Sequence, residues 1–216
     1  HLRDDMLMQM PVLESRYPTY KTYGEAALSD VLSSEHLASD KNFTVDTFET
    51  SVFINEEGES FRVETLPEEA QFAPVFGLLT GDFDADGLPD ILMTGNSFST
   101  ETFTGWYDAF NGLLLKGNGE GNFEAVPISE SGFYFPGDAK ALASLTGVHD
   151  EKLILASRNN GELEIFEANH SKGQTALRLQ PDDRSVEIKD INGRVEKREF
   201  YEGGGYLSQK SRILFT

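Results

Sequence analysis

The chain contains no cysteine among its 216 residues, which excludes disulfide bonds and thiolate metal sites. It has no run approaching the roughly 20 apolar residues of a membrane-spanning helix, and no signal peptide is visible. Basic residues are scarce, because 18 Lys and Arg stand against 37 Asp and Glu and give a formal net charge of −19. That charge argues against nucleic-acid binding, in which Lys and Arg must neutralise phosphates, and it favours solubility and cation binding.

Hydrophobic residues make up 38% and aromatic residues 11% of the chain, which suffices for a buried core and argues against wholesale disorder. Sixteen Phe and twenty Gly favour many short strands joined by tight turns. The length fits one large or two small domains. The first residue is His1 rather than Met, so we expect a piece of a longer protein, with any targeting signal upstream.

The clearest chemical signal is an acidic stretch over residues 81–90. Four aspartates occupy positions 1, 3, 5 and 9 of a tight loop whose sixth position is Gly87: Asp82, Asp84, Asp86 and Asp90. Crowded carboxylates repel one another unless a cation lies among them, and calcium takes six to eight oxygens at about 2.3–2.6 Å. We therefore expect a calcium site formed by the four side chains and the backbone carbonyl of Leu88, with Gly87 making the turn.

Three alternatives compete with this interpretation. The EF-hand also begins D-x-D-x-D-G, but it needs a Glu at position 12, where this chain has Met93 between strand-like flanks. We reject it on that ground. A metal-free acidic turn is the second alternative, although a turn needs one Asp and one Gly rather than four spaced carboxylates. Magnesium is the third, since spacing alone does not exclude it, although it prefers a tighter octahedron with several waters.

The rest of the chain divides by pattern. Residues 1–47 read as a helical segment with a helix expected over Thr22–Leu32, and strand signals dominate afterwards. A hairpin with a glycine turn is expected at residues 50–64. The same pattern recurs at residues 112–126, and a third unit is expected at residues 141–166. The phenylalanines that open the returning strands of the first two hairpins lie 62 positions apart (123 minus 61). Such self-similarity indicates a repeat architecture.

Residues 76–123 resemble the FG-GAP or VCBS repeat, the blade of integrin-like β-propellers. The resemblance rests on Phe76-Gly77, the acidic loop, and the glycine-rich turn 117–122 followed by Phe123. In that family a D-x-D-x-D-G-x-x-D loop joins the first two strands of a blade and binds calcium. The resemblance implies a carbonyl ligand at Leu88 and four side-chain ligands: Asp82, Asp84, Asp86 and Asp90.

The segment 195–211 looks like the ASPIC/UnbV module, which often follows such repeats in secreted bacterial proteins and in cartilage acidic proteins. Its most specific string is Gly-Tyr-Leu-Ser-Gln at residues 205–209. The family's closing Phe-Gly-Leu-Gly is absent, as is the Asn-rich stretch that usually precedes the module. The sequence therefore predicts a shortened variant.

Propellers close with about four to eight four-stranded blades, and this chain holds about two and a half. We therefore expect either the last blades of a longer chain or an open fragment covered by the N-terminal helices. The predicted fold is mainly β, a partial β-propeller of two to three four-stranded blades with a short helical N-terminal segment. The predicted divisions are residues 1–47 (helical), 48–168 (blades) and 169–216 (ASPIC/UnbV-like).

A long loop at residues 96–111 separates two strands of the calcium blade and holds five aromatic residues: Phe98, Phe103, Trp106, Tyr107 and Phe110. Connections longer than about 12–15 residues are usually functional or disordered. Trp106 and Tyr107 are candidate partner contacts, able to stack on a sugar ring or to anchor a protein. In the alternative, these aromatics fold over the edge of their own blade.

No catalytic constellation of comparable clarity is present, so an enzyme is not expected. The sequence favours a non-catalytic, calcium-binding module of a secreted, periplasmic or cell-surface protein that binds a protein or glycan in adhesion. The alternative is an accessory domain of a polysaccharide-processing enzyme whose active site lies elsewhere.

Overall fold

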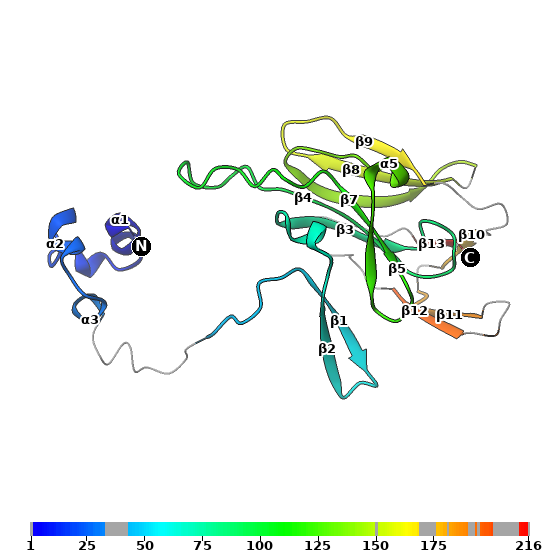
Figure 1. Cartoon of the computed structure of the whole chain (residues 1–216), viewed down its shortest axis with the longest axis horizontal. Coiled ribbons are helices and arrows are strands. Elements are labelled where there is room, and N and C mark those ends of the chain that lie inside the picture. Colours follow the sequence, from blue (N-terminus) through cyan, green and yellow to red (C-terminus); the bar gives the residue numbers. More distant parts are fainter. Residues whose placement is uncertain are drawn as a thin grey trace. The chain divides into compact units, whose positions relative to one another are not determined.

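The computed structural model describes residues 2–32, 43–149, 151–168, 176–180, 182–189, 193, 195–200 and 212–215. The chain divides into two compact units, His1–Phe48 and Glu49–Thr216. Strands predominate over helices, so the prediction of a mainly β chain is confirmed (Figure 1). Within the described ranges, no helix has the length and apolar character needed to cross a membrane. The segment 201–211, which carries the Gly-Tyr-Leu-Ser-Gln string, lies outside the described residues.

The first unit packs four short helical segments around Leu13, Tyr17 and Val31: α1 (Arg3–Gln9), η1 (Pro11–Leu13), α2 (Tyr20–Gly24) and α3 (Leu28–Val31). The single helix expected over Thr22–Leu32 is therefore wrong. Ala27 has an extended backbone (φ −78°, ψ 161°), and its N–H donates to the Asp30 carboxylate at 2.9 Å. That bond starts a new helix and separates α3 from α2.

The second unit begins with a hairpin of β1 (Ser51–Glu56) and β2 (Ser60–Thr65), followed by η2 (Glu68–Gln71). A four-stranded antiparallel sheet follows in chain order: β3 (Val75–Gly81), β4 (Asp90–Gly95), β5 (Leu113–Gly117) and β6 (Phe123–Val126). Helix α5 (Ile128–Ser131) leads to a three-stranded sheet: β7 (Ala139–Thr146), β8 (Lys152–Arg158) and β9 (Glu164–Glu167). Two small two-stranded antiparallel sheets complete the unit, β10 (Ala176–Arg178) with β13 (Ile213–Phe215) and β11 (Ser185–Lys189) with β12 (Val195–Glu199).

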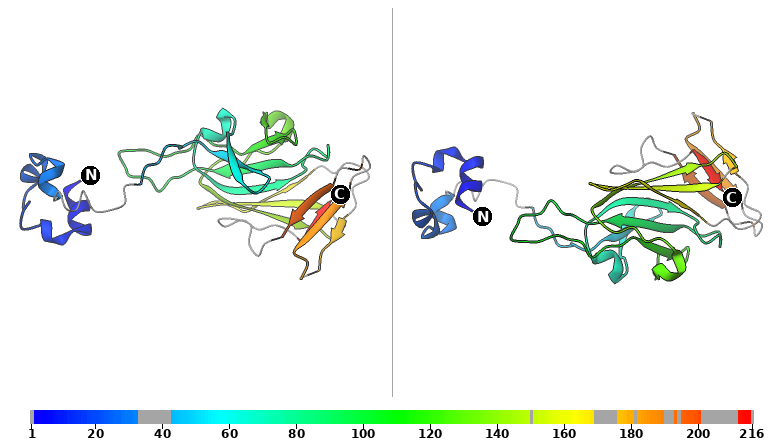
Figure 2. Two further views of the ribbon diagram at one scale, coloured as in Figure 1. Left: turned by 90° about the horizontal axis from the view of Figure 1, so that it is seen from below. Right: turned by 90° about the horizontal axis from the view of Figure 1, so that it is seen from above.

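Strand β4 is the centre of the second unit, because all six of its residues are buried. Alternate side chains of a strand face opposite sides of its sheet, so β4 must be covered on both faces. Ile91 and Met93 pack into one core with Leu66 and Ala70, near η2. Leu92 packs into a second core that the four-stranded and three-stranded sheets share. Figure 2 shows these sheets as two layers, with η2 and α5 outside the four-stranded one.

The two sheets approach most closely where β3 faces β7, and Gly77 makes this approach possible. A Cβ atom at Gly77 would lie 2.7 Å from Thr94 Cγ2 and 3.0 Å from the backbone nitrogen of Leu142. No side chain fits in that gap. The first strands of the two sheets therefore pack directly against each other.

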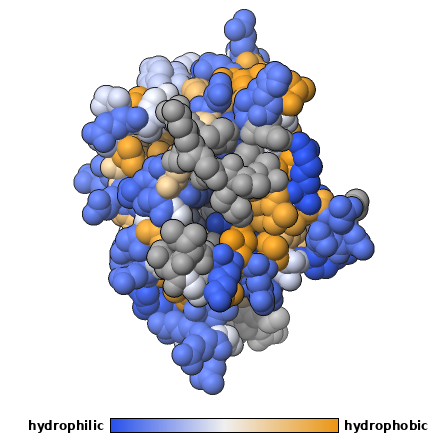
Figure 3. Space-filling model, turned by 90° about the vertical axis from the view of Figure 1, so that its right-hand side faces the viewer, coloured by the Kyte–Doolittle hydropathy of each residue, from blue (hydrophilic) through white to orange (hydrophobic). Residues whose placement is uncertain are grey.

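The strand count differs from the expected two to three four-stranded blades. Among the described residues, one sheet has four strands, and the sheet at residues 139–167 has three. The first hairpin forms a sheet of its own, which Gln71 ties down by hydrogen bonds to the backbone of Thr50 and Leu66 at 2.7–3.0 Å. At the end of this unit that carries β10 and β13, apolar and hydrophilic side chains are interspersed on the surface (Figure 3).

Candidate metal centre

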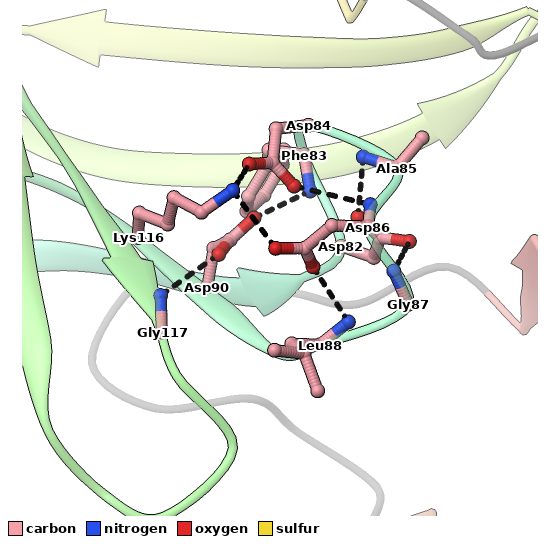
Figure 4. Close-up of polar contacts among 10 residues, drawn as sticks. All are labelled: Asp82, Phe83, Asp84, Ala85, Asp86, Gly87, Leu88, Asp90, Lys116 and Gly117. Atoms are coloured by element: carbon pink, nitrogen blue, oxygen red, sulfur yellow. Dashed lines mark hydrogen bonds and ion pairs between the residues drawn. The ribbon is translucent and has the colours of Figure 1, made fainter.

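The acidic loop joins β3 to β4 and is shaped by its own aspartates (Figure 4). The Asp82 carboxylate accepts hydrogen bonds from the N–H groups of Ala85 at 2.6 Å and Gly87 at 3.0 Å. Ala85 and Gly87 both adopt left-handed backbone conformations, with φ of +63° and +84°. These bonds curl the chain so that alternate carboxylates point inward.

Three of the predicted ligands converge. Single carboxylate oxygens of Asp82, Asp84 and Asp86 lie within 4.8 Å of one another, on a half-buried to exposed part of the surface. Calcium and magnesium are hard cations that bind oxygen donors of this kind. The donor set therefore fits a hard divalent cation.

A positive charge already lies among these carboxylates. Lys116, on β5, places its ammonium group 2.8 Å from Asp86 Oδ2 and also pairs with Asp84 Oδ2. Its hydrogen bonds to Asp84 and then to Asp86 raise the pKa of Lys116 above its usual value. Burial pushes the pKa of Asp86 upward, but the bonds from Lys116 and from the Leu88 N–H outweigh it and hold that pKa below its usual value. The loop is thus neutralised in part by a cation of its own chain.

Asp90 differs from the other three aspartates in burial and in partners. Its side chain is 1% exposed, and its two oxygens accept hydrogen bonds from the N–H groups of Phe83 at 2.8 Å and Gly117 at 3.0 Å. Burial raises the pKa of Asp90 above its usual value, against the effect of these two bonds. Asp90 thus ties the loop to β5, and its role as a metal ligand stays a prediction.

Leu88 was expected to contribute its carbonyl oxygen. The structure places its N–H 2.8 Å from Asp86 Oδ1, to which it donates. This bond fixes the peptide at the exit of the loop. A carbonyl contact from Leu88 to a metal also stays a prediction.

Lys152 supports the loop from the second sheet. Its ammonium donates to the backbone carbonyl of Asp82 at 3.0 Å and lies 4.1 Å from the centre of the Phe83 ring. Burial lowers the pKa of Lys152 to about 8, although the charges of Asp82 and Asp90 oppose the shift. This lysine therefore connects the acidic loop to β8.

The candidate partner contacts lie on the surface, and their role in binding stays a prediction. Trp106 is 64% exposed, Tyr107 46% and Phe103 100%. Phe98 stacks on Trp106 with ring centres 4.5 Å apart and planes 5° apart. Phe110 behaves as in the alternative interpretation, because it is 2% exposed and belongs to the core.

Sequence reasoning missed two features of these sites. One is Lys116, which is 32 residues from Asp84 and reaches the loop only through the register of β5 on β4. The other is the ion pair of Asp138 with Lys140, at 2.7 Å, beneath the aromatic loop. No local spacing predicts the first pair, whereas Asp138 and Lys140 are only two positions apart, a spacing that places both side chains on one side of a strand. Their common signal is a charged residue at the edge of a predicted strand.

Comparison with known proteins finds no matching family model, no matching curated protein and no matching solved structure. The resemblance to FG-GAP/VCBS repeats and to the ASPIC/UnbV module therefore rests on the motifs of the sequence. The chemistry of the acidic loop rests on its own geometry.

Proposed function

We propose that the second unit is a non-catalytic binding module in which calcium stiffens the loop between β3 and β4. The observation that carries the proposal is the convergence of Asp82, Asp84 and Asp86 around a position that already attracts a cation, the ammonium of Lys116. A hard divalent cation would satisfy the same oxygens with two charges instead of one. Calcium suits the site because its coordination is flexible and accepts carboxylates together with backbone carbonyls.

Lys116 must give way for calcium to bind between Asp84 and Asp86. Its side chain is 45% exposed, so the ammonium can move into water when the metal takes its place. The metal therefore competes with a tethered monovalent cation, and the measured affinity is the difference between the two interactions. Because of this competition we expect weak binding, with a dissociation constant of about 10⁻⁴–10⁻³ M, as in the calcium sites of extracellular modules.

The architecture supports a blade-like scaffold for such a module. The four-stranded sheet runs in simple up-and-down order, and β3 and β7, the first strands of their sheets, pack against each other. Repeated face-to-face packing of such sheets is the arrangement of a propeller. We infer that the unit forms propeller-like blades of a secreted or surface protein that binds a protein or glycan partner.

Isothermal calorimetry with calcium chloride on the full chain tests the metal site. The wild type should bind calcium with a measurable heat, and Asp84→Asn should weaken binding on the order of tenfold or more, because a neutral amide replaces a charged ligand. Asp46→Asn makes the same chemical change at an exposed position outside the loop and should bind like the wild type. The absence of binding in the wild type, or equal binding by Asp84→Asn, would contradict the proposal.

A further inference from the structure

Backbone hydrogen bonds give the aromatic loop (residues 96–111) a defined conformation. The N–H of Ser97 donates to the carbonyl of Tyr107 at 2.9 Å, and the N–H of Tyr107 donates back at 3.0 Å, so the loop opens as a short antiparallel ribbon. Stacked Phe98 and Trp106 follow directly on this bridge. At the tip, Thr104 N–H donates to the Glu101 carbonyl at 2.9 Å. Trp106 and Tyr107 are therefore held in place before any partner arrives.

Buried polar contacts fix the base of the loop. Asn96 is fully buried at a strained φ of +92°, and its side chain bonds to the N–H and carbonyl of Phe110 and to the carbonyl of Gly137 at 2.7–3.0 Å. Lys140 donates to the Asn96 carbonyl at 2.8 Å and pairs with the buried Asp138. Strain of this kind persists only where the surroundings over-determine it, and it is common at functional sites.

The loop exposes apolar surface that the fold does not use. Phe103 is completely exposed, and Trp106 and Tyr107 are about half exposed or more, at 64% and 46%. Exposed aromatic clusters on otherwise hydrophilic proteins mark interaction sites. Aromatic side chains also lose little entropy when they bind, so a fixed set of them favours affinity.

The returning arm of the loop continues into an apolar hollow of about 350 Å³. Phe72, Phe110 and Ile128 are among its lining residues, and Glu69 is the one charged residue among the described residues that line it. Phe72 and Ile128 are partly exposed, at 49% and 38%. The volume lies at the lower end of the range for small ligand pockets, and it would accept one or two aliphatic side chains.

The charge of the aromatic loop indicates which kind of partner it would bind. Residues 96–111 contain no Lys, Arg or His, and their charged residues are Glu101 and Asp108. The whole chain carries a formal charge of −19. A negatively charged, aromatic surface complements arginine, whose guanidinium stacks on Trp and Tyr faces and pairs with carboxylates. A neutral sugar could donate hydrogen bonds to these carboxylates, but it offers no positive charge to pair with them.

We propose that the aromatic loop and the hollow beside it form a docking surface for a basic protein segment, with arginine on the exposed side of the Trp106 ring and an aliphatic side chain in the hollow. This inference rests on the proposed binding function and names the class of partner. It does not depend on calcium, because no residue of the acidic loop belongs to the surface.

Trp106 is the only tryptophan of the chain, so its fluorescence reports on this surface alone. The full chain is titrated in EDTA with an acetylated nonapeptide of repeated Arg-Leu-Gly, which has no fluorescence of its own. We expect a saturable blue shift as Trp106 leaves water. The double variant Glu101→Gln, Asp108→Asn should weaken binding about fivefold. The matched double variant Glu57→Gln, Glu59→Gln, with the same charge change in the exposed turn between β1 and β2, should bind like the wild type.

Two further probes decide between classes of ligand. The same peptide with Glu in place of Arg should give no shift, and cellohexaose, a neutral oligosaccharide, should give none either. A saturable shift with cellohexaose and none with the Arg peptide would overturn the proposal in favour of a glycan. Equal weakening in both double variants, equal binding of both peptides, or no shift with any probe would also overturn it. Because the titration is metal-free, its failure is distinct from a failure of calcium binding.

Discussion

Asp90 shows how one carboxylate can join two strands. It is buried and accepts two backbone hydrogen bonds, from Phe83 and from Gly117. Asp90→Ala removes both acceptors and leaves the buried N–H of Gly117 unpaired. We expect a loss of about 3 kcal/mol in the free energy of unfolding, because bonds to charged groups contribute more than neutral ones. Urea unfolding in EDTA measures this loss without any contribution from metal.

Asp90→Asn is the matched test, because it keeps one carbonyl oxygen in the same place. It should retain one of the two backbone bonds and destabilise the chain less than Asp90→Ala does. Equal stability of the wild type and Asp90→Ala in EDTA would show that Asp90 has no structural role in the metal-free chain.

Lys152 should give stability an unusual dependence on pH. Burial lowers its pKa from the usual 10.5 to about 8, so between these values the unfolded chain binds more protons than the folded one. Stability therefore rises as pH increases through this window. A shift of this size corresponds to about 3 kcal/mol. Between pH 8 and pH 10.5, the free energy of unfolding of the wild type should therefore rise by that amount relative to that of Lys152→Met. Urea unfolding in EDTA measures both values. A difference that falls as the pH rises would contradict the lowered pKa of Lys152.

At the residue scale, the sequence predicts what is local. Asp82, Asp84 and Asp86 could be identified because alternate residues of one tight turn converge whatever surrounds them. The partners of the loop could not be identified in this way. Lys116 and Gly117 lie 27 or more positions along the chain from the carboxylates that they contact, and the register of β5 alone brings them there.

At the element scale, Gly77 controls the distance between the two sheets. A methyl group there would lie 2.7 Å from Thr94 Cγ2 and 3.1 Å from the Ala141 carbonyl carbon. Gly77→Ala should therefore push β7 away from β3 and destabilise the second unit by about 1–3 kcal/mol, the usual cost of overpacking. Urea unfolding monitored by circular dichroism measures the change.

Gly24→Ala is the control for this substitution. Gly24 ends α2, and a Cβ atom there would meet nothing within 4 Å. It should leave stability unchanged or slightly higher, because Ala is the better helix former. Equal effects of the two substitutions would show that the sheets tolerate a wider separation at Gly77.

Elements defined by turns were predicted well, and those defined by packing were not. The hairpins expected at residues 50–64 and 112–126 correspond to β1–β2 and β5–β6, since glycine turns and alternating apolar residues are local signals. The prediction of a single helix over Thr22–Leu32 was wrong, because the Asp30 carboxylate accepts a hydrogen bond from the Ala27 N–H and a new helix begins there. The first hairpin was predicted to be part of a blade, but β1 and β2 form a sheet of their own. Tertiary contacts, here the hydrogen bonds of Gln71 to the backbone of Thr50, fix its position, and local patterns do not predict them.

At the scale of the whole molecule, composition predicts the fold class. Many Gly and Phe and an apolar alternation lead to a mainly β chain, and the structure has one. Composition does not predict how the sheets are arranged. The outer face of the three-stranded sheet still carries exposed Leu145 and Ile165, at 47% and 61%, as expected for a surface on which a further layer can pack.

The central claim is that calcium and the Lys116 ammonium compete for one position. Thermal melting of the wild type, Lys116→Met and Lys21→Met, each in EDTA and in saturating calcium, tests it most directly. Lys21 is 81% exposed in the N-terminal unit, so its substitution controls for the loss of one positive charge. Calcium at a hundredfold excess over its dissociation constant stabilises by about 2.7 kcal/mol, or roughly 5–10 °C for a chain of this size.

We predict that Lys116→Met melts below the wild type in EDTA, because the carboxylates of Asp84 and Asp86 then lack their cation, and that calcium raises its melting temperature by more than it raises that of the wild type. Lys21→Met should follow the wild type in both conditions. If calcium leaves the wild type unchanged, the acidic loop is no calcium site. If calcium stabilises the wild type and Lys116→Met equally, the lysine does not compete with the metal.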